Sequence, residues 1–105
     1  MFRDKNLPLT ETVYYILLAL TEPAHGYVLM QKVEELSNGQ VRLAVGTLYG
    51  AIENLLSKGF IRQMFGGNDR RKVYIITKSG RDILHADYQR ISHMKTITEK
   101  ITKAC

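Results

Sequence analysis

Residues 66–80, GGNDRRKVYIITKSG, contain three consecutive cations, Arg70, Arg71 and Lys72, between a glycine-rich turn and an alternating apolar strand. Cationic side chains in such a run bind phosphate groups, along a nucleic-acid backbone or in a minor groove. The net charge of +5 is concentrated around them, because residues 40–81 hold eight Lys and Arg against two Asp and Glu. A concentrated cationic surface favours a polyanionic partner, although a charge run taken alone is more often only a solvated surface.

A second set of polar residues lies on a helix predicted over about residues 45–58. Thr47 and Tyr49 come near its start, where their hydroxyls and the first backbone N–H groups can contact phosphate. Gly50 is less favourable than alanine by about 1 kcal/mol inside a helix, so it indicates either a packing contact or a close approach of the helix to DNA. The predicted DNA-contacting residues are Thr47, Tyr49, Gly50, Asn54, Lys58, Arg70, Arg71 and Lys72.

No pattern of a catalytic or metal site accompanies these residues. His85 and His93 are eight positions apart with no Cys or Glu at a metal-binding spacing, and His25 is expected to be a cap or turn residue. The sequence has no nucleophile elbow and no phosphate-binding glycine loop. The single cysteine, Cys105, can close no intramolecular disulfide, which fits a reducing compartment. We therefore expect no enzyme, no metal and no cofactor.

Length and hydropathy predict one domain in the cytoplasm. A chain of 105 residues supports a single modest core. Its longest apolar run, residues 13–20, is far shorter than the roughly 18–20 residues of a membrane span. The N-terminal residues lack the apolar region and cleavage site of a signal peptide. We expect a cytoplasmic protein with no membrane partner.

Hydrophobic periodicity and turn residues define the elements that carry the polar sets. A short turn after Pro23 joins the first two helices, Asn38-Gly39 ends the second, Gly59 caps the third, and residues 40–43 form a short extended piece. We assign the apolar stripe of the second helix to Tyr27, Leu29, Met30, Val33 and Leu36. The predicted elements are helices over about residues 10–21, 25–37 and 45–58, strands over 60–65 and 71–77, and a helix from 78 onward.

This order predicts a mainly α fold with a small β-hairpin, a winged helix-turn-helix. The second and third helices form the helix-turn-helix, and the hairpin forms the wing. A cationic run at the tip of a wing is placed to contact DNA, so its position favours a binding role over a solvated charge run.

The last helix is longer than a three-helix core needs. Thr77 caps it, and from Leu84 its apolar residues recur at a near-heptad spacing. Such a row packs either on the helix's own core or on another chain, and we expect a homodimer. We divide the chain into a DNA-binding domain, residues 1–77, and a dimerisation helix, residues 78–105. The predicted interface residues are Leu84, Tyr88, Ile91, Met94, Ile97 and Ile101.

Four segments together resemble the PadR family of bacterial winged-helix transcriptional regulators. They are LTETVYYILLALTEPAHGYVL, GTLYGAIENLLSKGFI, DRRKVYIIT and TKSG, and they cover about residues 7–84. The resemblance implies a homodimeric repressor whose recognition helices enter successive major grooves of a pseudo-palindromic operator. It places Thr47, Tyr49 and Gly50 at the DNA and residues 70–72 on the flanking backbone. The short C-terminus is similar to the small subgroup with a single dimerisation helix.

The chain departs from the family pattern at two places. Some members of the small subgroup bind flat aromatic drugs between tryptophans at the dimer centre, but this chain has no tryptophan and carries Ile91 at the matching position. A small apolar effector at the dimer interface therefore remains open. Ala44-Val45 stands where the family often has Ser-Pro, so the third helix lacks its usual side-chain cap.

Two other partner classes remain open from the residues alone. The third helix has no net charge, which leaves a winged-helix module that binds a protein instead of DNA. A membrane surface is less favoured, because the cations lie on a hairpin and loops and not on one side of an apolar-faced helix.

Overall fold

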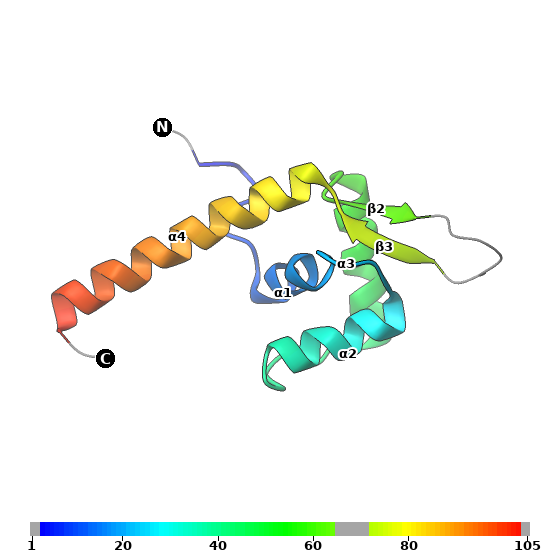
Figure 1. Cartoon of the computed structure of the whole chain (residues 1–105), viewed down its shortest axis with the longest axis horizontal. Helices are drawn as coiled ribbons and strands as arrows, with labels where there is room; N and C mark the ends of the chain where they lie inside the picture. Colours follow the sequence, from blue (N-terminus) through cyan, green and yellow to red (C-terminus); the bar gives the residue numbers. More distant parts are fainter. Residues whose placement is uncertain (1–2, 65–71, 104–105) are drawn as a thin grey trace.

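The computed structural model describes residues 3–64 and 72–103 of the chain. It is mostly helical with a small antiparallel sheet, and one long helix extends from the body (Figure 1). This confirms the predicted fold class. The elements in order are α1 (Glu11–Ala19), β1 (Ala24–His25), α2 (Gly26–Leu36), α3 (Val45–Ser57), β2 (Ile61–Met64), β3 (Val73–Ile76) and α4 (Lys78–Thr102).

The first three helices enclose the core together with β2 and β3. Each helix contributes residues three, four or seven positions apart, the spacing that lines one helical face. Burying each such side chain contributes about 1.5–3 kcal/mol relative to leaving it exposed. The innermost apolar residues are Ile16, Leu17, Leu20, Leu29, Val33, Leu48, Ile52 and Ile61.

Most helix boundaries follow the local signals that predicted them. The Thr10 hydroxyl accepts a hydrogen bond from the backbone N–H of Val13 at 3.1 Å, which caps α1. Gly39, with φ of 78°, and Gly59, with φ of 74°, turn the chain after α2 and α3, in the left-handed conformation that glycine adopts most easily. Ala44 precedes α3 and makes no side-chain cap bond, as its residue type predicts.

The sheet has three strands in the order β1-β3-β2, so the predicted hairpin is only part of it. Ala24 and His25 pair with Tyr74 and Val73, where we predicted a simple turn. Two residues are too few for an alternating pattern to be visible, and β1 exists only because β3 supplies its partner. Residues 41–44 form no strand.

Strands β2 and β3 pair antiparallel, with Ile61 opposite Ile76 and Met64 opposite Val73. Tyr74 and Ile76 are buried, while Val73 and Ile75 are half-buried, which confirms the predicted alternation. The predicted outer ends of these strands at residues 65 and 71 lie outside the described residues.

The apolar stripe of α2 is narrower than predicted. Leu29 and Val33 are fully buried, but Tyr27 is 70% exposed and Leu36 is 43% exposed. Successive helix residues are rotated by about 100°, so Tyr27 lies on nearly the opposite side of the helix from Leu29. The assignment of Tyr27 to the core was wrong.

Helix α4 is anchored to the body at its first turns. The Thr77 hydroxyl accepts from the Gly80 N–H at 3.0 Å and donates to the Gly59 carbonyl at 2.6 Å. A Cβ atom on residue 80 would collide with the Phe60 carbonyl oxygen, so only glycine allows this approach. Ile83 is buried in the core and Leu84 packs against it, and beyond them α4 leads away from the body (Figure 1).

Candidate nucleic-acid interface

The outer face of α3 carries the residues that the sequence assigns to DNA. The opposite face is fixed by Leu48, Ile52 and Leu55, which are at most 2% exposed. The spacing of these three therefore turns the polar positions outward. Their binding to DNA remains a prediction. The exposed candidates on α3 and at its C-terminal end are Thr47, Tyr49, Gly50, Asn54 and Lys58.

Gly50 makes no close packing contact in this structure. Apart from its two chain neighbours and the nearby backbone of α3, no heavy atom of the described residues lies within 4 Å of the place that a Cβ atom would take. An intrachain packing contact therefore does not explain a residue that is unfavourable in a helix by about 1 kcal/mol. The other interpretation, a close approach of the helix backbone to DNA, stays a prediction.

Tyr49 packs against the start of α2. A Cβ atom on residue 26 would lie 2.6 Å from the Tyr49 hydroxyl oxygen and 3.0 Å from its Cζ atom, so the ring occupies the space beside Gly26. This contact joins the HGY and GTLY segments, which are far apart in sequence. Tyr49 nevertheless remains 44% exposed.

Tyr74 lies near Tyr49, and only 3% of its surface is exposed. Burial, followed by the nearby Tyr49 phenol and the Glu53 carboxylate, raises the pKa of Tyr74 above its ordinary value of 10.0. The Tyr74 hydroxyl is therefore neutral at physiological pH, and it adds no charge to the surface beside Tyr49.

The base of the wing meets the same surface. Tyr49 and Lys72 both line a hollow of about 220 Å³ between β3, α2 and α3. Lys72 is exposed, and its backbone carbonyl oxygen lies 3.4 Å from His25 Nδ1. The structure thus brings together the predicted contacts Tyr49 and Lys72. Arg70 and Arg71 lie outside the described residues, and their role remains a prediction.

His25 stands at the N-cap position of α2, but its side chain makes no cap hydrogen bond. The expected position as a cap residue is therefore confirmed. Two neighbours in the same hollow, Tyr27 and Val28, are exposed apolar residues that the sequence did not assign to a binding surface. Their helical phase relative to Leu29 and Val33 is the signal that identifies them.

The apolar row on α4 does not pack on the chain's own core beyond Leu84. Its members are between 37% and 75% exposed, so the row does not fold back on the body. The dimer interface that we predict there remains a prediction. The exposed residues of the row are Tyr88, Ile91, Met94, Ile97 and Ile101.

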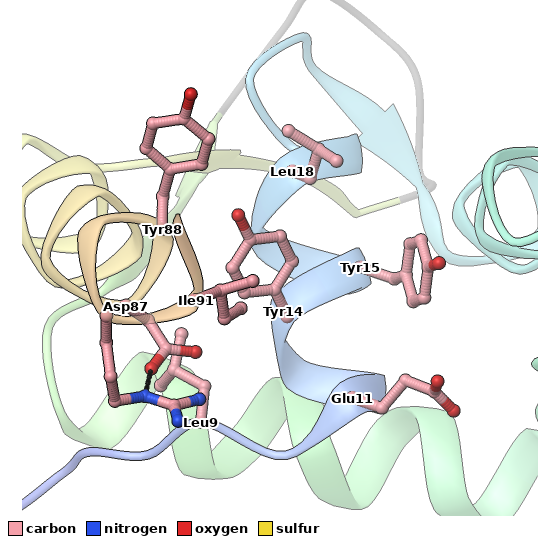
Figure 2. A pocket seen from close by; sticks show the side chains of 9 residues that line it. Leu9, Glu11, Tyr14, Tyr15, Leu18, Asp87, Tyr88 and Ile91 are labelled. Atoms are coloured by element: carbon pink, nitrogen blue, oxygen red, sulfur yellow. Dashed lines mark hydrogen bonds and ion pairs between the residues drawn. The ribbon is translucent and has the colours of Figure 1, made fainter. Parts of the chain in front are cut away.

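A groove of about 600 Å³ lies between α1 and the first half of α4. Figure 2 shows Tyr14 and Leu18 on the α1 side, with Tyr88 and Ile91 on the α4 side. Burial, followed by the Asp87 carboxylate, raises the pKa of Tyr14. The lining is therefore mainly apolar and aromatic, with a carboxylate at its edge.

That carboxylate belongs to Asp87, which is 99% buried, and only one of its two oxygen atoms has a hydrogen-bond partner among the described residues. Its Oδ1 atom accepts a hydrogen bond from Arg90 Nε at 2.5 Å, drawn as the dashed line in Figure 2. Its Oδ2 atom has no hydrogen-bond partner among the described residues. An unpaired buried polar atom costs about 1–3 kcal/mol, so Asp87 Oδ2 destabilises the chain at this groove unless a bound molecule donates a hydrogen bond to it.

Neither a metal cluster nor a membrane-spanning helix is found in residues 3–64 and 72–103. No group of three or more His, Cys, Asp or Glu side chains in these ranges is arranged to hold a metal ion. None of the described helices is long and apolar enough to cross a bilayer.

The sequence profile of the transcriptional regulator PadR-like family matches residues 15–86. The chain belongs to this family. Membership places it among transcription regulators and not among enzymes, and it confirms the resemblance drawn from HGY, GTLY and the basic wing.

Individual relatives agree with this assignment. A transcriptional regulator of Clostridium thermocellum superposes with a TM-score of 0.71 over 95% of this chain and 97% of its own, at 19% identity, and supports the fold. Bacillus subtilis PadR in complex with operator DNA is 26% identical, with a TM-score of 0.61, over 75% of this chain and 47% of its own.

A curated relative, an uncharacterized 37.1 kDa protein in transposon TN4556 of Streptomyces fradiae, is 33% identical over 73 residues. That match covers 69% of this chain, and the chain spans about a fifth (20%) of the relative's length.

Proposed function

We propose that this chain is a sequence-specific DNA-binding repressor that acts as a homodimer on a pseudo-palindromic operator. The observation that carries the proposal is the shared surface of Tyr49 on α3 and Lys72 at the wing. A recognition helix and a cationic wing on one face can contact a groove and the adjacent phosphates together. Bacillus subtilis PadR, 26% identical, binds operator DNA with the same fold.

The bare surface at Gly50 supports the same proposal. With no Cβ and no intrachain neighbour within 4 Å, the α3 backbone can approach a phosphate or a base edge closely. Since the only charged residue of α3 is Glu53, which Lys58 at the C-cap balances, shape and polar contacts carry recognition, while Lys72, Arg70 and Arg71 supply the phosphate attraction.

The exposed apolar row on α4 supports dimerisation. Two α4 helices that pair through Ile91, Met94 and Ile97 place two recognition helices on one duplex. A twofold axis in the protein then matches the twofold axis of the operator.

The groove between α1 and α4 supports an effector-responsive regulator. Its lining by Tyr14, Leu18 and Ile91 suits a small apolar molecule, and its position beside the α4 row couples such a molecule to the dimer interface. Release of the operator by this effector, and repression of the chain's own promoter or of a neighbouring transporter gene, complete the proposal.

The test is fluorescence anisotropy with a labelled duplex from the DNA upstream of the gene that encodes this chain. An unrelated duplex is titrated beside it, and both are measured across a salt series. Specific regulators bind their sites about 10³-fold or more tightly than other DNA, and we expect a difference of that order. Equally weak binding to both duplexes contradicts the proposal and favours a protein partner for the winged helix.

A further inference from the structure

We infer that Gly26 is a positioning residue of the DNA-binding surface, because it leaves the space in which the Tyr49 ring lies against the start of α2. The ring position in turn sets where the Tyr49 hydroxyl meets the DNA backbone. The inference rests on the proposed function, since it concerns a DNA contact of Tyr49.

The space beside Gly26 is already filled by the Tyr49 ring. An added Cβ atom would lie 2.6 Å from the hydroxyl oxygen, 3.0 Å from Cζ and 3.5 Å from Cε1. The first distance is shorter than real Cβ atoms show, and the second is tighter than most. Any side chain at position 26 therefore displaces the end of the Tyr49 ring that carries the hydroxyl.

The backbone of Gly26 does not explain why this residue is glycine. Gly39 and Gly59 have positive φ angles, whereas Gly26 does not. Gly26 is the first residue of α2, a position where other residues are stable. The requirement at position 26 is therefore space for Tyr49 and not conformational freedom.

The glycines of the chain differ in what surrounds them. At Gly80 an added Cβ would meet the backbone oxygen of Phe60, which cannot rotate away. At Gly46 and Gly50 it would meet no atom of the described residues within 4 Å beyond their chain neighbours and the nearby backbone of α3. At Gly26 it meets the far end of one side chain, so we expect Gly26→Ala to fold, with Tyr49 moved outward.

A fixed Tyr49 ring favours binding in two ways. The ring is held beside the start of α2 before DNA arrives, so it loses less rotational freedom on binding. Tyr49 and Lys72 also line the same hollow, so both groups can contact one strand of the DNA backbone.

The test is a double-mutant cycle of Gly26→Ala and Tyr49→Ala, read as operator affinity. Loss of one hydrogen bond to a charged phosphate corresponds to about a tenfold loss of affinity, and we expect this from Gly26→Ala. In the Tyr49→Ala background Gly26→Ala should cause no further loss, because the ring it displaces is gone. Gln31→Ala, at an exposed position on α2, controls for added helix propensity and should bind as wild type.

Wild-type affinity in Gly26→Ala, or the same loss in both backgrounds, overturns the inference. Thermal unfolding of each variant accompanies the titration, and a merely structural role of Gly26 would lower stability without coupling to Tyr49.

NMR of the Tyr49 ring resonances in free Gly26→Ala protein separates this inference from the proposed function. Unchanged resonances overturn the positioning itself. If the wild type binds no duplex, the proposed function and the DNA role of Tyr49 fail together. Shifted ring resonances then still support the contact between Gly26 and Tyr49.

Discussion

The helical body and the outer half of α4 use the same apolar periodicity with different results. In α1 and at its C-cap, Ile16, Leu17 and Leu20 are completely buried in the core of the body. In α4, the residues from Tyr88 to Ile101 that continue the same spacing are 37–75% exposed. Apolar periodicity therefore predicts that one face of a helix packs against other side chains, but it does not predict whether those side chains belong to the same chain. The body completes its own core, whereas the α4 row stays exposed, and we propose that a second copy of the chain covers it.

The largest expected effect is a loss of stability of the helical body. Leu17→Ala removes a completely buried side chain and should lower the free energy of unfolding by about 2–5 kcal/mol, through lost burial and a residual cavity. Chemical denaturation measures the change. A loss below about 1 kcal/mol would mean that the core around α1 is not what stabilises the body.

The next effect separates α4 from the body. Ile91→Lys places a charge in the exposed row and should convert a dimer into monomers by light scattering, while the melting curve of the body is largely retained. His93→Lys is the matched control, because His93 is exposed and lies two positions, or about 200°, around the helix. A dimer that survives Ile91→Lys would place the interface elsewhere.

A smaller effect tests whether the wing contributes to DNA contact independently of the α4 row. Arg70→Ala combined with Arg71→Ala should weaken binding to all duplexes alike. If each arginine neutralises one phosphate, the log–log salt dependence should flatten by up to about 2 units. Light scattering should still find a dimer, since the α4 row is untouched. Unchanged affinity in this variant would exclude a wing contact.

The smallest effect concerns pH and lies within the body. Burial raises the pKa of Tyr74, so the folded state holds the phenol proton more tightly than the unfolded state. The stability this provides is fully present below about pH 10, the ordinary tyrosine pKa, and is lost as pH rises through the raised value. Tyr74→Phe should make the fall of stability above pH 10 less steep in denaturant titrations, whereas an identical fall would contradict the assignment.

Local signals predicted the helix boundaries because each depends on one or two residues. Thr10 and Thr77 cap helices through hydrogen bonds three residues away, and Gly39 ends α2 with its own backbone angle. The exposed face of α3 was predictable for the same reason, since Leu48 and Ile52 fix the phase of the helix. These features depend on residues within one segment and not on a contact with a distant part of the chain.

The features that the sequence missed depend on distant partners. Strand β1 forms because Ala24 and His25 meet β3, some fifty residues later. The need for glycine at position 26 is explained by the Tyr49 ring, and neither residue predicts that contact when it is considered alone. Tyr27 was placed in the core by residue type, although its phase relative to Leu29 puts it on the surface.

The molecule is thus proposed to combine a DNA-contacting body with a helix that pairs two copies. Footprinting of the wild-type chain on its upstream duplex tests both halves together. We expect two protected half-sites whose centres lie about 34–36 Å, one turn of the duplex, or a multiple of that distance apart. Protection of a single isolated half-site would contradict the paired arrangement, and no protection at any concentration would contradict DNA recognition by the body.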